Sequence, residues 1–183
     1  IAEVSANAPN AAGRSVVEWG IGAVGIESFQ QATATAFGAI FVLLILYFRG
    51  WILPLLVLTP IAMTIVLTFA ASSLLGISLN MANILMVPLI LGLGVDTGIH
   101  IVHRHRQTQR EGGGQAMDPA IRRAVMISGL TTVGTFCSLS LSPHQGAASI
   151  GLLLTIAISL LLVISLVLMP ILLRWFAPVP SSG

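Results

Sequence analysis

The residue most able to do chemistry is Asp96, a carboxylate in an apolar, glycine-rich part of the predicted membrane span 79–104. A charged residue at the centre of a membrane helix costs roughly 2.5–3.5 kcal/mol on insertion scales, so such residues usually face a bundle interior or a water path and often carry protons or ions. Asp96 is therefore the first candidate for a functional group. The alternative is a structural hydrogen-bond anchor between helices.

Two histidines follow Asp96 on the same helical face, because residues at i+4 and i+7 share a face with residue i. At 1.5 Å rise per residue, His100 and His103 lie about 6 and 10 Å along the helix from Asp96. Imidazole changes its charge near neutral pH, so a carboxylate with imidazole neighbours can form a proton path. The alternative for the histidines is simple hydration near Arg104, at the end of the span.

A metal site is a competing interpretation of Asp96, His100, His103 and His105, because carboxylate and imidazole groups are both zinc ligands. His105 falls on a different helical face, and no cysteine or second acid is near in the sequence. We therefore expect no metal and no cofactor. The sequence also contains no GxSxG, HExxH or P-loop motif, so an enzyme is not expected.

Hydroxyl residues form a polar stripe on the predicted helix 120–142. They recur at helical spacing: Ser128, Thr131, Thr132, Thr135 and Ser138. Hydroxyls both donate and accept hydrogen bonds, so a stripe facing Asp96 could solvate the carboxylate and pass protons. The alternative is that these side chains bond to their own helix and help it to pack.

Glycines surround Asp96 and predict close helix packing. Gly94 and Gly98 form a small-xxx-small pair, which lets a neighbouring helix approach the backbone. Gly92 lies one turn before Asp96 on the same face. We predict that all three take part in helix packing.

Composition indicates a membrane protein, since 56% of the 183 residues are hydrophobic and 8% are charged, against about 25% charged in soluble domains. About 20 apolar residues span a hydrocarbon core. Five segments meet that length: 29–48, 51–75, 79–104, 120–142 and 147–173. The predicted fold is an all-α bundle of five transmembrane helices over residues 29–175.

The two ends of the chain are more polar than these spans. We predict that residues 1–28 are an external segment leading into the membrane and that residues 176–183 are a cytoplasmic tail. No signal peptide is expected at the start, and the chain reads as a piece of something longer, without a soluble catalytic domain.

All eight basic residues are arginines, and their positions predict an orientation. Seven of them fall at one end of the predicted bundle: Arg49, Arg104, Arg106, Arg110, Arg122, Arg123 and Arg174. By the positive-inside rule this end is cytoplasmic, so the N-terminus is outside. This topology explains the basic charge without nucleic acid, and no nucleic-acid partner is expected.

Prolines mark helix boundaries and predicted kinks. Asp118 and Pro119 read as an N-cap and first-turn proline, and the segment 142–146 reads as a turn. Pro60 and Pro88 fall inside predicted spans, where each removes a backbone donor and should kink its helix.

Three stretches resemble a known superfamily: GLGVDTGIH at 92–100, SGLTTVGTF at 128–136 and LSPHQGAASIGLLL at 141–154. Together they resemble the resistance-nodulation-cell division (RND) superfamily, and in particular the C-terminal transmembrane half of its hopanoid-transporter branch, close to the MMPL lipid exporters. The resemblance covers about residues 29–175.

The resemblance implies a transporter of the bacterial inner membrane that is driven by the proton gradient. Such a transporter has two six-helix repeats, each with a large periplasmic domain after its first helix. The five spans would be the last five of the second repeat, with residues 1–28 as the end of its periplasmic domain. The missing N-terminal half and membrane lipids would be partners, and a homo-oligomer stays open.

Family roles implied by the resemblance centre on Asp96 as the proton-relay acid, with Thr131 and Thr132 beside it. Many MMPL relatives have tyrosine after the acid, where this chain has Thr97, which keeps a hydroxyl. His100 completes the predicted relay. The resemblance also implies a relay lysine in the second half of drug-efflux relatives, and because this chain has no lysine, it favours lipid export over drug efflux. The alternative is a non-exporting relative, such as a sterol-sensing domain or the SecD and SecF protein-translocation motor.

Overall fold

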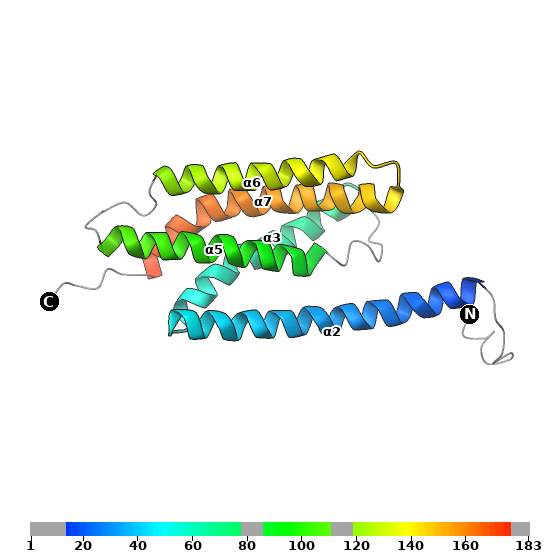
Figure 1. Cartoon of the computed structure of the whole chain (residues 1–183), viewed down its shortest axis with the longest axis horizontal. Helices are drawn as coiled ribbons and strands as arrows, with labels where there is room; N and C mark the ends of the chain where they lie inside the picture. The colour runs from blue at the N-terminus through cyan, green and yellow to red at the C-terminus, as the bar shows by residue number, and fades with distance from the viewer. Residues whose placement is uncertain (1–13, 78–85, 111–118, 177–183) are drawn as a thin grey trace.

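The structure is a computed structural model that describes residues 14–77, 86–110 and 119–176. These residues form five helices (Figure 1): α2 (Arg14–Phe48), α3 (Ile52–Leu74), α5 (Met86–Arg110), α6 (Pro119–Ser140) and α7 (Gln145–Phe176). The predicted all-α bundle of five helices is confirmed.

Four of these helices are long and apolar enough to cross a membrane: Ser28–Phe48 within α2, Ile52–Leu74, Met86–Thr108 and Gln145–Phe176. The fifth predicted span, on α6, is a helix but is not among them. The hydroxyl stripe of α6, together with Arg122 and Arg123 in its first turns, lowers its hydropathy. A polar helix enters a membrane more readily when it packs on an apolar one, and α6 runs alongside α7 (Figure 1).

Helix α7 is the centre of the bundle. It packs against α6, α3 and α5, whereas α5 and α6 hardly touch each other. Leu153, Ala157 and Leu161 of α7 are almost completely buried. The bundle therefore depends on one apolar helix that its neighbours share.

Among the side chains of α2 that the structure describes, the buried ones are Leu44 and Phe48, both near its C-terminal end. Within its membrane span 11% of the residues are buried, against 44–50% in the other three spans. It also begins at Arg14, well before the predicted span at residue 29. The predicted span covers only the C-terminal part of this helix, because a helix can continue beyond the roughly 20 residues that cross a hydrocarbon core.

The prolines partly match the predicted positions. Pro60 lies inside α3 as predicted, and Pro170 lies inside α7. Pro88 is the third described residue of α5, and because the residues before Met86 lie outside the described ranges, the kink predicted there stays a prediction. Pro119 is the first residue of α6 as predicted, and its predicted N-cap, Asp118, lies outside the described residues.

The glycines of α5 allow close contact with α3. A Cβ atom added at Gly98 would lie 2.6 Å from Cγ1 of Val57, and one added at Gly94 would lie 2.6 Å from Cγ1 of Ile61. Gly92 faces open space, with nothing within 4 Å of an added Cβ. The structure thus places two of the three glycines at a helix crossing and the third outside it.

We predict that Gly98→Ala destabilises the intact protein by about 1–3 kcal/mol, the usual cost of overpacking a core. Val57 is β-branched and has little rotamer freedom to move away. Thermal unfolding in detergent measures the change. Gly92→Ala is the matched control and should be neutral or slightly stabilising. Gly98→Ala should cost less stability in a Val57→Ala background than in the wild type, and equal costs in the two backgrounds would contradict the packing account.

Candidate functional site

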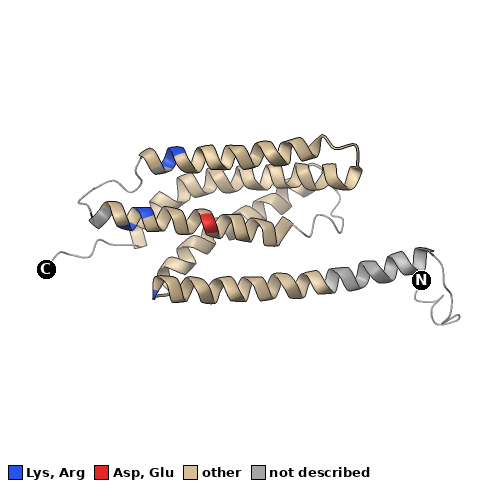
Figure 2. Ribbon diagram, in the orientation of Figure 1, with Lys and Arg blue, Asp and Glu red and all other residues tan. Residues whose placement is uncertain are grey.

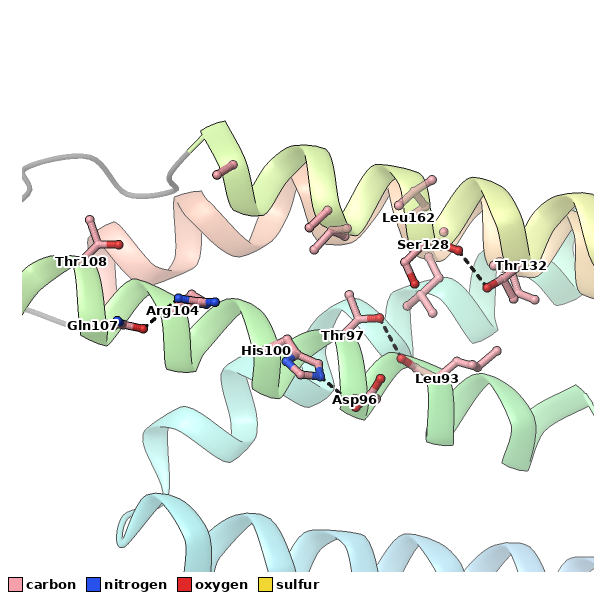
Figure 3. A pocket seen from close by; sticks show the side chains of 16 residues that line it. Leu93, Asp96, Thr97, His100, Arg104, Gln107, Thr108, Ser128, Thr132 and Leu162 are labelled. Atoms are coloured by element: carbon pink, nitrogen blue, oxygen red, sulfur yellow. Dashed lines mark hydrogen bonds and ion pairs between the residues drawn. The ribbon is translucent and has the colours of Figure 1, made fainter.

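Asp96 lies near the middle of α5. In Figure 2 the acidic part of the ribbon, in red, lies farther along the bundle than the arginines, in blue, which are at one end. Asp96 is the only acidic residue whose side chain the structure describes. Its side chain is 74% exposed in this chain, and its Oδ1 lies 3.4 Å from Nε2 of His100, one turn further along. The predicted pairing of Asp96 with His100 on one helical face is therefore present as a direct contact (Figure 3).

A groove of about 520 Å³ lies next to this pair, between α5, α6 and α7. It is lined by Leu93, Asp96, Thr97, His100, Arg104, Gln107 and Thr108 of α5, by Ala120, Ala124, Val125, Ser128, Gly129 and Thr132 of α6, and by Ile158, Leu161 and Leu162 of α7. The groove exists because α5 and α6 both pack on α7 but barely contact each other.

The two long walls of the groove differ in polarity. Helix α5 contributes a polar wall that leads from Asp96 past His100 to Arg104, and α7 contributes a leucine-rich one. At the arginine-rich end, Nη1 of Arg104 donates a hydrogen bond to Oε1 of Gln107, 3.0 Å away. Polar residues of α5 therefore line the groove from the middle of the helix to Gln107 and Thr108.

Hydroxyl groups in the groove donate to their own helices. Thr97 Oγ1 donates to the Leu93 carbonyl at 2.9 Å, and Thr132 Oγ1 donates to the Ser128 carbonyl at 2.9 Å (Figure 3). Such bonds use the hydroxyl proton and leave lone pairs on the oxygen. These oxygens can accept hydrogen bonds from water in the groove.

The hydroxyl stripe of α6 is divided by the packing. Ser128 and Thr132 line the groove with Asp96, but Thr131 does not. Thr131 is exposed, and its hydroxyl donates to the Ile127 carbonyl at 2.8 Å. Of the two threonines expected beside the acid, the structure brings one to the groove.

The other histidines of α5 lie elsewhere. Nδ1 of His103 is 3.3 Å from the Tyr47 hydroxyl of α2, and His105 is buried at 5% exposure. Among the described residues, no three histidine, cysteine or acidic side chains gather in a way that could hold a metal ion. Of the four residues considered for zinc, Asp96 and His100 are in contact, whereas His103 and His105 lie in other surroundings.

Sequence reasoning missed part of the groove. Arg104 and Gln107 continue the helical spacing of Asp96 and His100, so the periodicity of α5 could have identified them. Leu161 and Leu162 belong to an apolar helix, where nothing in the sequence separates a groove wall from core. Their role follows only from the position of α7.

Together these features define a class of protein: a multi-pass, all-helical membrane protein with an ionisable residue halfway along one span, beside a polar groove. The family model described as the MMPL family matches residues 10–180. The chain belongs to the MMPL family, which is part of the RND superfamily.

Individual relatives agree with this membership. The chain is 38% identical over 144 residues to the hopanoid transporter HpnN of Rhodopseudomonas palustris and 33% identical over 147 residues to HpnN of Burkholderia multivorans. It is also 36% identical over 151 residues to MJ1562 of Methanocaldococcus jannaschii, whose name describes it only as a membrane protein.

These alignments cover about four fifths of the chain but much less of each relative. They span 79%, 80% and 79% of this chain, and 38%, 16% and 16% of MJ1562, the Burkholderia protein and the Rhodopseudomonas protein. The chain thus corresponds to a minor part of the length of each of these relatives.

We predict that the groove admits water. In the intact protein with Cys137→Ser, a cysteine introduced by Ser128→Cys should react with a water-soluble thiol reagent, because thiols ionise and react in water. Val163→Cys, on an outward face of α7 with 60% exposure, is the control and should resist in a bilayer. Mass spectrometry measures the labelling. Equal labelling at the two positions would contradict a water-filled groove.

Proposed function

We propose that this chain is part of a proton-driven RND lipid exporter, which moves hopanoid or related lipids from the inner membrane toward the outer membrane. The observation that carries the proposal is the exposed Asp96 carboxylate, halfway along a membrane span and next to a groove of about 520 Å³. Because hydrocarbon cannot solvate a carboxylate, this group must face water or protein in the membrane.

Protonation of Asp96 supplies the energetic difference between two states. The neutral acid can approach apolar surroundings, whereas the carboxylate requires the polar wall of the groove. An equilibrium between two packings of α5 therefore shifts when the proton binds. Sparse contact between α5 and α6 leaves room for such a change, while Gly94 and Gly98 keep α5 close to α3.

The relay that we propose contains Asp96, His100, Thr97 and Thr132, while Thr131, the other threonine expected beside the acid, lies outside the groove. His100 is in contact with Asp96 and lies on the side toward Arg104. Thr97 and Thr132 bring hydroxyl oxygens to the same groove. Protons would enter at Asp96 and leave along the polar wall toward the arginine-rich end, which we assign to the cytoplasm by the positive-inside rule.

Two observations support lipid as the cargo. The two hopanoid transporters are similar to this chain across most of its length. The absence of lysine from the sequence removes the relay lysine expected by resemblance for drug-efflux relatives. We therefore place the protein in the bacterial inner membrane, with the N-terminus in the periplasm and membrane lipids as its partners.

We predict that Asp96→Asn in the intact protein abolishes proton-dependent lipid export, because the amide keeps the shape of the side chain but takes up no proton. Asp96→Glu should retain part of the activity. Release of labelled hopanoid from proteoliposomes with and without a proton gradient measures the effect. Thr59→Val, which removes an exposed hydroxyl of α3 outside the groove, is the control. Full export by Asp96→Asn would rule out the relay, and lipid binding unaffected by the gradient would favour a sensor.

We predict that the neighbouring threonines of α6 differ in effect. Thr132→Val should slow export, because it removes a hydroxyl from the groove, and Thr131→Val should change it much less. His100→Gln should also slow export, because it removes the imidazole in contact with Asp96. Initial export rates at fixed proton gradient measure all three variants. Equal loss in the two threonine variants would show that position in the groove is not what matters.

A further inference from the structure

A second cluster of charged and aromatic residues lies where α2 turns into α3. We call it the α2–α3 corner and define it by Tyr47, Arg49 and Trp51, with His103 and Arg106 of α5 beside it. None of these residues lines the groove beside Asp96. The corner is at the arginine-rich end of the bundle, and the proton path proposed above does not use it.

Two contacts join this corner to α5. The Tyr47 hydroxyl lies 3.3 Å from Nδ1 of His103, and Cζ of Arg106 lies 5.6 Å from the centre of the Phe48 ring. Tyr47 and Phe48 also meet edge to face, with ring centroids 4.9 Å apart. The Arg106 guanidinium thus lies over Phe48 in the last turn of α2. Phe48 is the residue directly before Arg49.

Arg49 has a backbone conformation that favours glycine. Its φ is 54°, and its N–H donates to the Ile45 carbonyl at 2.8 Å, which closes the C-terminal end of α2. A side chain is disfavoured in this left-handed region. Gly76, two residues after the end of α3, has a similar φ of 64°. An arginine at the first of these two caps has a steric cost that glycine would avoid, and it places an exposed guanidinium at the helix end.

The surroundings of Arg49 suit the boundary between membrane and water. Trp51 is 65% exposed, and its ring lies 6.1 Å from that of Phe41 on α2. Trp and Tyr are enriched at this boundary, where their rings reach both the apolar and the polar region. Exposed Leu46 and Ile52 adjoin the corner from the two helices and offer an apolar surface for acyl chains.

Positive charge at the corner has no carboxylate beside it among the residues with described side chains. Asp96 is the only acid among them, and it is paired with His100 near mid-membrane. Arg106 contacts the Phe48 ring rather than an acid. Two guanidinium groups with an aromatic frame and no acid form a surface complementary to a phosphate.

We propose that the α2–α3 corner binds the headgroup of an anionic phospholipid from the cytoplasmic leaflet. The phosphate lies between the guanidinium groups of Arg49 and Arg106, Trp51 lies at the level of the glycerol, and the acyl chains run along Leu46 and Ile52. Basic pockets between helices on the cytoplasmic side are suited to such headgroups. The bound lipid joins α2, which is otherwise poorly packed, to the helix that carries Asp96.

Binding is tested on the intact protein in nanodiscs of phosphatidylcholine with increasing phosphatidylglycerol, by native mass spectrometry and thermal unfolding. The wild type should retain phosphatidylglycerol and unfold at higher temperature as its fraction rises. Arg49→Gln and Arg106→Gln should each weaken retention by roughly fivefold, since each arginine near an anionic surface contributes about 1 kcal/mol. Arg174→Gln removes the same charge from the last turn of α7 and should leave retention unchanged.

Arg49→Gly separates lipid binding from folding. Glycine accepts the left-handed conformation, so this variant should be at least as stable as the wild type in phosphatidylcholine and yet lose the stabilisation by phosphatidylglycerol. Inorganic phosphate at millimolar concentration should not replace the lipid, because it lacks acyl chains. Equal losses in Arg174→Gln and Arg49→Gln, or stabilisation of Arg49→Gly by phosphatidylglycerol as strong as that of the wild type, would overturn the proposal.

Discussion

The interior of a bilayer offers no hydrogen-bond partners, and this constraint explains most of the structure. Backbone groups are satisfied within five helices, and buried hydroxyls such as Thr64 and Thr68 of α3 donate to carbonyls one turn back, at 2.8 and 2.7 Å. A carboxylate cannot be satisfied in this way. Asp96 instead meets His100 and borders a polar groove, and the groove exists because α5 and α6 share α7 rather than each other.

Helix α5 has one face that packs closely against α3 and an opposite face that is exposed. One carries Gly94 and Gly98, which bring its backbone against Ile61 and Val57 of α3. The other carries Asp96 and His100 and stays open in this chain. Close packing against α3 fixes one side of α5. On the open side, a change in the charge of Asp96 can change which groups surround that residue. The proposed proton coupling needs these two properties together.

The arginine-rich end adds a second link to the same helix. His103 and Arg106 of α5 hold the last turn of α2 through Tyr47 and Phe48, while the rest of the α2 span has few contacts. Movement of α5 and movement of α2 are therefore joined at one point. If the α2–α3 corner binds an anionic lipid as proposed, the strength of the contact between α2 and α5 depends on the charge of the nearby lipid headgroups. Arginine, tryptophan and tyrosine side chains are suited to that headgroup region.

The sequence by itself determined the helices, the arginine-rich end and the family, and it identified Asp96 as the candidate acid, because hydropathy, charge and short motifs are local properties. Spacing also identified the face shared by Asp96 and His100. Only the tertiary structure decided which way each face points. It placed Thr132 but not Thr131 in the groove, packed Gly94 and Gly98 but not Gly92, and brought His103 to Tyr47. Periodicity defines faces relative to one helix axis, whereas the neighbour of each face depends on how separate helices rotate and pack around α7.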